Sequence, residues 1–132
     1  MFDAKELARK AIEAKSKAVA PYSNFHVGAA LLSSSGRIFK GANIENSSYG
    51  LTICAERTAA FQAVLEGERD FEAIAIAGDT DDYLPPCGAC RQVLSDLCGK
   101  NLEVIMINQK DELKKFTLGE LIPFSFGEEF LK

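Results

Sequence analysis

Residues 54–57 read CAER and residues 86–92 read PCGACRQ, and these two stretches decide the interpretation of the whole chain. Each stands at the start of a predicted helix, over residues 54–66 and 88–98. The first of these segments is apolar nearly all round and stops at Gly67, as expected of a buried helix. The first N–H groups of a helix lack intrahelical partners and carry the positive end of its dipole. A thiol placed there has a lowered pKa and favours the thiolate, the form that binds metal.

The cysteines of the two stretches are therefore candidate metal ligands. Cys87 and Cys90 are close enough in sequence to face one point, and Cys54 can complete a set of three from the neighbouring helix. Three protein ligands with one open position are typical of catalytic zinc, whereas four ligands close a structural site. Cys98 lies about 12 Å beyond Cys90 along a continuous helix, so we expect it to be a buried apolar residue. The single histidine, His26, is interpreted as a strand residue. The sequence thus predicts one Zn²⁺ per subunit.

The residues that follow Cys54 complete a possible catalytic group. Zinc with three thiolates carries a formal charge of −1, which weakens it as a Lewis acid. The two helix starts offset part of this charge, and Arg57 can donate hydrogen bonds to the sulfurs. Glu56 is near enough to exchange a proton with water at the open position without being a ligand. Its alternative role is that of an acidic residue favoured in a helix's first turn. A three-thiolate site beside it favours the catalytic role.

The flanking segments predict an α/β domain spanning residues 1–132. Apolar periodicity places a first helix after Asp3 that ends before Pro21. A short last helix is expected where Thr117 and Glu120 form a capping box. Strands are expected at residues 25–32, 37–45, 73–77, 102–107 and 113–117. Together these elements predict a mixed sheet of about five strands with helices on its faces.

Composition limits the class of protein. The chain has 132 residues, of which 47% are hydrophobic and 26% charged, as in ordinary globular proteins. No apolar stretch approaches the roughly 18–20 residues of a membrane span, and the first residues lack a signal-type apolar block. We therefore expect a cytoplasmic protein with no membrane partner. The net charge of −4, with dispersed Lys and Arg, argues against a polynucleotide partner and favours a small molecule.

The motifs resemble a known family. The first two stretches fit the zinc nucleobase deaminase signature, a His or Cys, one residue and Glu, followed by P-C-x-x-C. With PYSNF at residues 21–25, VGAA at 27–30 and NIEN at 43–46, the chain resembles the small homotetrameric cytidine deaminases over nearly its whole length. The resemblance implies a three-layer α/β/α cytidine-deaminase-like fold. It also implies hydrolytic deamination of free cytidine and deoxycytidine, in pyrimidine salvage, by a homotetramer with shared active sites.

The resemblance further implies roles for substrate-binding residues. Asn43 and Glu45 resemble the pair that holds the ribose hydroxyls, and residues two apart on a strand do share a face. An exposed strand edge is the alternative for this pair. Phe25 resembles the aromatic residue that packs on the pyrimidine, with a core phenylalanine as the alternative. Ala55 resembles the residue whose backbone contacts the base.

Other residues resemble those that link subunits or support the site. Tyr49 and Phe126 resemble residues that enter a neighbouring subunit's pocket, and Phe124 competes with Phe126 for this role. Arg91 and Gln92 are expected to support the metal site or the tetramer.

Three alternative functions remain open at this point. The first is a related nucleoside-antibiotic deaminase of the blasticidin type, against which Arg57 and the Asn43/Glu45 pair favour cytidine. The second is a polynucleotide-editing deaminase, which the acidic charge and short length disfavour. The third is a zinc-stabilised interaction module, which predicts a fourth protein ligand and gives no reason for Glu56.

Overall fold

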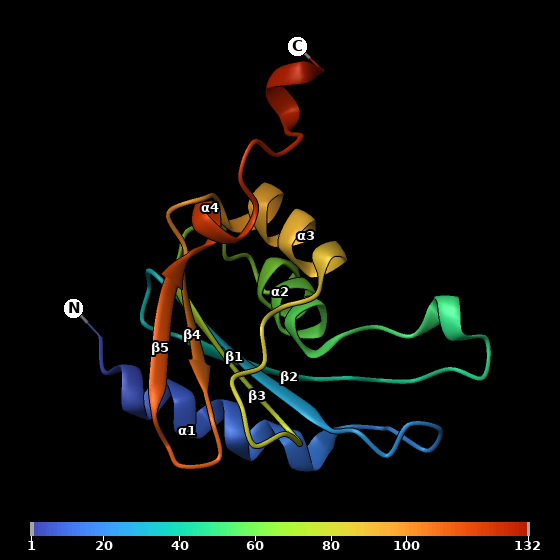
Figure 1. The fold of residues 1–132 in the computed structure, drawn as a ribbon. Helices are drawn as coiled ribbons and strands as arrows, with labels where there is room; N and C mark the ends of the chain where they lie inside the picture. Colours follow the sequence, from blue (N-terminus) through green and yellow to red (C-terminus); the bar gives the residue numbers. More distant parts are fainter. Residues whose placement is uncertain (1, 132) are drawn as a thin grey trace.

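The computed structural model describes residues 2–131, so the two end residues of the expected domain lie outside the described part. Across that part, five strands form one mixed sheet in the order β2-β1-β3-β4-β5 (Figure 1). Strands β3 and β4 are parallel, and the other neighbouring pairs are antiparallel. The mixed sheet predicted from the sequence is confirmed. The strands are β1 (Val27–Ser33), β2 (Ile38–Ala42), β3 (Phe71–Gly78), β4 (Glu103–Ile107) and β5 (Leu113–Thr117).

Helices cover both faces of this sheet. Helix α1 lies on one face, and helices α2 and α3 lie on the other (Figure 1). This is the expected three-layer α/β/α arrangement. No helix within residues 2–131 is both long and apolar enough to cross a membrane. The helices are α1 (Ala4–Ala14), α2 (Ala55–Leu65), α3 (Gly88–Cys98) and the short α4 (Leu118–Leu121), with 3₁₀ turns η1 (Lys15–Lys17), η2 (Tyr49–Leu51) and η3 (Glu128–Phe130).

The layers follow from side-chain alternation along the central strands. In β1, Ala29 and Leu31 pack in the cluster beneath α2 and α3, while Ala30 and Leu32 pack in the cluster beneath α1. Successive residues of a strand point to opposite faces, so a strand covered on both sides is apolar throughout. The same reason explains the unbroken apolar run of β3.

Two glycines allow the helices to approach the sheet closely. A Cβ at Gly28 would overlap the carbonyl oxygen of Ala11 in α1. A Cβ at Gly41 would overlap the carbonyl oxygen of Ala55 and lie 2.6 Å from Thr58 Oγ1. The first turn of α2 therefore rests directly on the backbone of β2, which fixes where this helix begins.

The sheet differs from the prediction along one edge. The expected strand over residues 37–45 is wrong at its end, because β2 stops at Ala42. The next residue leaves the ladder, and the Asn43 side chain accepts a hydrogen bond from Val27 N at 2.8 Å. The expected strand over residues 25–32 is wrong at its start for the same reason, since β1 begins only at Val27.

Candidate active site

Three cysteine sulfurs lie together where α2 and α3 begin. Cys54 is the N-cap of α2, Cys87 is the N-cap of α3, and Cys90 lies in the first turn of α3. The Cys87 Sγ lies 3.6 Å from the Cys54 Sγ and 3.2 Å from the Cys90 Sγ. Sulfurs around a tetrahedral zinc, with bonds of about 2.3 Å, are separated by about 3.8 Å. The spacing and the thiol chemistry of the group therefore fit the predicted Zn²⁺.

Within residues 2–131, this is the one group of three or more His, Cys, Asp or Glu side chains whose ligand atoms lie within 4.8 Å of one another. Cys98 lies outside it, packed against the core at the far end of α3, where burial raises its pKa to about 12. His26 also lies outside it, with its Nδ1 2.6 Å from Asp79 Oδ2. The interpretation of His26 as a strand residue is wrong, because it precedes the first residue of β1.

The electrostatics of the group favour cation binding. Hydrogen bonding with Cys90, and then with Arg57 and Cys87, lowers the pKa of Cys54 to about 5. The Arg57 Nη2 donates to the Cys54 Sγ at 3.5 Å, as expected from the sequence. The hydrogen bond with Cys54, followed by burial, raises the pKa of Cys90. These shifts favour the thiolate form at Cys54, beside the guanidinium.

Glu56 is a buried carboxyl group next to the sulfurs. Its side chain is 4% exposed. Burial, and then the charge on Cys54, raises the pKa of Glu56. A carboxyl group with a raised pKa can both accept and release a proton nearer neutral pH, which is what general acid–base catalysis requires.

A cavity of about 280 Å³ connects the sulfurs with the predicted substrate-binding residues. This volume is near the lower end of the range for small-molecule sites, about 300–1,000 Å³. Of the six predicted substrate-binding residues, the lining includes four. Cys54, Glu56 and Cys87 are predicted residues of the metal site. The remaining lining residues were not selected from the sequence, although Ser23 and Val27 lie within recognised motifs, Pro85 lies directly before one, and Thr52 and Leu84 each lie two residues before one. The cavity is lined by Ser23, Phe25, Val27, Asn43, Glu45, Thr52, Cys54, Ala55, Glu56, Leu84, Pro85 and Cys87.

Asn43 and Glu45 shape the cavity wall as well as lining it. The Asn43 Nδ2 donates to the Phe25 carbonyl oxygen at 2.8 Å. The Glu45 Oε1 accepts from the backbone N–H groups of Tyr22 and Ser23 at 3.0 and 3.2 Å, and its Oε2 accepts from the Ser23 hydroxyl. These bonds, the hydroxyl's first, lower the pKa of Glu45. An amide has a second N–H and a carboxylate accepts up to about four hydrogen bonds, so both keep capacity for a ligand.

Tyr49 and Phe126 lie outside the cavity of this chain. Tyr49 is 77% exposed, and its ring meets that of Tyr22 edge-on at 6.3 Å. Phe126 is 57% exposed and stacks on Phe130 at 5.6 Å. Both phenylalanines belong to the C-terminal tail, which extends away from the sheet (Figure 1). Their exposure leaves them available to a neighbouring molecule.

Arg91 and Gln92 hold segments on either side of α3. The Arg91 Nε donates to the Pro86 carbonyl oxygen and its Nη1 to the Leu121 carbonyl oxygen, each at 2.8 Å. The Gln92 Nε2 donates to the Phe126 carbonyl oxygen at 3.1 Å. Arg91 therefore holds Pro86, the residue before the candidate ligand Cys87, and Gln92 anchors the tail.

Comparison with known proteins identifies the family of this chain. The profile of the cytidine and deoxycytidylate deaminase zinc-binding region matches residues 1–106. A cytidine deaminase of Halalkalibacterium halodurans is 50% identical over 97% of this chain and 97% of its own. The chain belongs to the cytidine deaminase family. Another cytidine deaminase, from Sporosarcina psychrophila, is 45% identical over 98% of this chain and 96% of its own.

The fold agrees with membership of the cytidine deaminase family. The crystal structure of cytidine deaminase from Burkholderia pseudomallei superposes with a TM-score of 0.91 at 46% sequence identity. The match covers 95% of this chain and 100% of the other. The family's zinc-binding region contains the three cysteines, so zinc is the cofactor that fits this donor set.

Proposed function

We propose that this protein is a cytidine deaminase that converts free cytidine and deoxycytidine, with one water, into uridine or deoxyuridine and ammonia, in pyrimidine salvage. One observation carries the proposal: Cys54, Cys87 and Glu56 line the same cavity as the predicted substrate-binding residues Phe25, Asn43 and Glu45. Relatives named cytidine deaminase, at up to 50% identity over nearly the full chain, support the same activity.

In this proposal Glu56 carries the protons. Zinc held by Cys54, Cys87 and Cys90 would supply a polarised water as the nucleophile. The Glu56 carboxylate takes a proton from the attacking water and gives it to N3 of the cytosine, which makes C4 more electrophilic. After the C4–O bond forms, Glu56 takes the proton of the new C4 hydroxyl and gives it to the amino group. The C4–N bond then breaks, ammonia leaves, and Glu56 returns to its starting state.

The remaining cavity residues orient the nucleoside. The Phe25 ring packs on the pyrimidine, and the backbone of Ala55 contacts the base. Asn43 and Glu45 bind the ribose hydroxyls with the hydrogen-bonding capacity that their contacts to residues 22–27 leave available. The apolar wall around the base excludes water, which strengthens each of these polar contacts.

The surface supports a homotetramer with shared active sites, which forms part of the proposal. Contiguous exposed apolar surface marks sites of protein–protein contact. Tyr49 and Phe126, with Phe124 as the alternative, are the side chains proposed to enter neighbouring cavities. Large apolar side chains exposed on this chain include Tyr49, Leu51, Phe61, Leu65, Phe124, Phe126, Phe130 and Leu131.

Two measurements test this assembly. Light scattering should give a mass of four chains. Mixing the inactive variants Tyr49→Ala and Glu56→Gln should restore part of the activity, because mixed tetramers contain some sites with both residues intact. A monomer with full activity would contradict the shared-site proposal.

The decisive test of function is an absorbance assay on the purified protein with a zinc measurement on the same sample. We expect turnover of cytidine and deoxycytidine at one zinc per chain, and little turnover of cytosine, dCMP, blasticidin S or single-stranded polynucleotide. Zinc-loaded protein that leaves both nucleosides unchanged would overturn the proposal. We place the activity in the cytoplasm, because reducing conditions keep the cysteines available as ligands.

A further inference from the structure

The end of β3 contacts the segment that carries Phe25 through a residue with no role in the proposed chemistry. The Asp79 Oδ2 accepts a hydrogen bond from the His26 backbone N–H at 2.8 Å and lies 2.6 Å from the His26 Nδ1. In return, the Asp79 backbone N–H donates to the His26 carbonyl oxygen at 3.1 Å. These contacts fix the backbone of His26, and His26 follows Phe25 directly in the chain.

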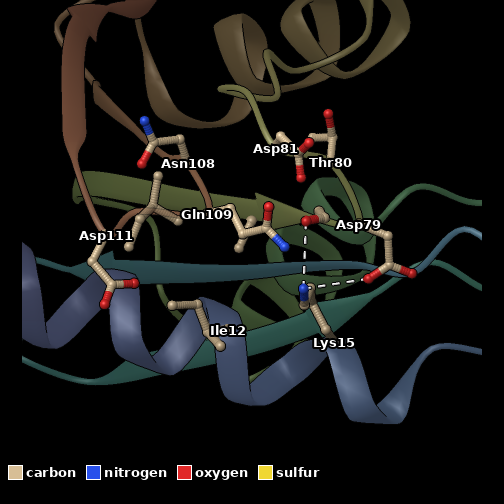
Figure 2. A pocket seen from close by; sticks show the side chains of 11 residues that line it. Ile12, Lys15, Asp79, Thr80, Asp81, Asn108, Gln109 and Asp111 are labelled. Carbon is tan, nitrogen blue, oxygen red and sulfur yellow. Dashed lines mark hydrogen bonds and ion pairs between the residues drawn. The ribbon is translucent and has the colours of Figure 1, made fainter.

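The same carboxylate is held from its other side. The Lys15 Nζ lies 3.3 Å from the Asp79 Oδ1 and donates to the Gly78 carbonyl oxygen at 3.4 Å (Figure 2). The hydrogen bond from the His26 backbone, then that from the His26 ring, and then Lys15 lower the pKa of Asp79. One charged side chain thus joins the end of β3, the turn after α1 and the segment before β1.

The residue before Asp79 shapes the cavity wall through its lack of a side chain. A Cβ at Gly78 would lie 2.5 Å from the Leu84 Cδ2 and 3.5 Å from the Phe25 Cζ. Phe25 and Leu84 both line the substrate cavity. Both side chains therefore lie over the bare backbone of Gly78, and the position of this backbone affects the position of the apolar wall.

We propose that Asp79 is a positioning residue for substrate binding: by fixing His26 beside Gly78, it places the Phe25 ring over Gly78 in the cavity wall and so sets how tightly the base is held. This inference rests on the base-binding role proposed above for Phe25. Asp79 lines a separate hollow with Lys15, Thr80 and Asp81 (Figure 2) and is not part of the substrate cavity's lining. It therefore acts through Phe25 and not by touching the nucleoside.

The first test separates binding from turnover. Asp79→Ala should raise the KM for cytidine about 10-fold with kcat changed less than about threefold, because the base is held in the ground state and the transition state alike. Asp79→Asn keeps one oxygen for the His26 N–H and should recover part of this loss. Asp81→Ala, which removes a carboxylate from the same loop and hollow, is the matched control and should leave both constants unchanged.

A double-mutant cycle tests whether Asp79 acts through Phe25. In a Phe25→Ala background, Asp79→Ala should change the KM by less than about twofold, because the ring that it positions is gone. Full multiplication of the two single effects, or an unchanged KM in Asp79→Ala, would overturn the inference. Zinc content and melting temperature, measured on each variant, identify losses that come from unfolding.

The cycle also separates this inference from the proposed function. If the parent protein does not deaminate cytidine, or if Phe25→Ala leaves the KM unchanged, the proposed function or base contact fails. If the parent deaminates cytidine and Phe25→Ala raises the KM, but Asp79→Ala leaves the KM unchanged, only the role of Asp79 fails. Should Asp79→Ala not fold, Gly78→Ala places a Cβ 2.5 Å from the Leu84 Cδ2 and so shifts the cavity wall beside Phe25, which should raise the KM. An unchanged KM would count against the placement argument.

Discussion

The two halves of the candidate site are built in different ways. In the metal half, Cys54, Cys87, Cys90 and Glu56 all lie at the starts of two adjacent helices. In the substrate half, the side chains of Asn43 and Glu45 shape irregular segments through hydrogen bonds to residues 16 to 23 positions away in sequence. The candidate catalytic group therefore rests on local helix geometry, whereas the proposed substrate-binding side chains rest on long-range contacts between loops. Perturbing each half should therefore change a different kinetic constant.

The largest effect is expected from removal of a metal ligand. Cys87→Ser exchanges an exposed sulfur, so the fold should persist while zinc and detectable turnover are lost, because two sulfurs no longer complete the ligand set. Chelation of zinc from the parent protein should give the same loss. A zinc assay and the absorbance assay measure both outcomes. Cys98→Ala is the matched control and should keep the metal and the rate, and retention of both by Cys87→Ser would refute this ligand assignment.

Glu56→Gln should have the next largest effect. We expect kcat to fall by about 10²- to 10⁴-fold with zinc retained, because the amide cannot carry a proton. The stability of the folded Glu56→Gln variant should not fall with its activity; it should stay the same or rise. A carboxyl group whose pKa is raised on folding destabilises the folded state once the pH exceeds that pKa, and this cost disappears below the unfolded value.

Melting curves of the metal-free proteins check this sign. At pH 8 the Glu56→Gln variant should melt at the same or a higher temperature than the parent. The difference should shrink as the pH falls towards 4.5, the ordinary pKa of the carboxyl group. A variant that melts well below the parent at pH 8 would mean that Glu56 stabilises the fold.

A smaller effect on the metal half is expected from Arg57→Gln. Loss of the guanidinium removes the hydrogen bond that helps to lower the pKa of Cys54, so zinc affinity should fall about 10- to 100-fold. Competition with a chelator measures this affinity. Arg37→Gln removes an exposed ion pair with Glu66 and should leave zinc affinity unchanged. Equal affinities for the two variants would exclude this role for Arg57.

The smallest effect is expected in the substrate half. Ser23→Ala removes the hydroxyl that donates to Glu45, which should raise the KM for cytidine about threefold at constant kcat. Ser16→Ala removes an exposed hydroxyl that donates to the Glu13 carbonyl oxygen and serves as the control. A fall in kcat without a change in KM would show that the two halves are not separable in this way.

The same contrast explains what the sequence could predict. The bounds of α3 and β5 and the Thr117–Glu120 capping box were predictable because their signals lie within a few residues. The three cysteines and the contact between Arg57 and Cys54 were predictable because helix starts bring them together. Local patterns therefore carried most of the metal half.

The errors lie where contacts between distant residues replace regular pairing. The end of β2 was not predictable, because the Asn43 side chain bonds the backbone on both sides of His26 in place of the ladder. The pair of His26 and Asp79 joins residues 53 positions apart, and no local pattern marks it. Leu84 reaches the cavity from a loop without periodicity, so no local pattern marks it as a lining residue.

The uneven exposure of the sulfurs has a consequence for how the protein becomes active. Cys90 is fully buried, whereas Cys87 reaches the surface. A cation can therefore arrive from solution at Cys87 and settle among the three sulfurs without any helix unwinding. A chain made during metal scarcity would fold first and acquire its ion later, so the zinc supply, and not the folding rate, would set the fraction of working molecules.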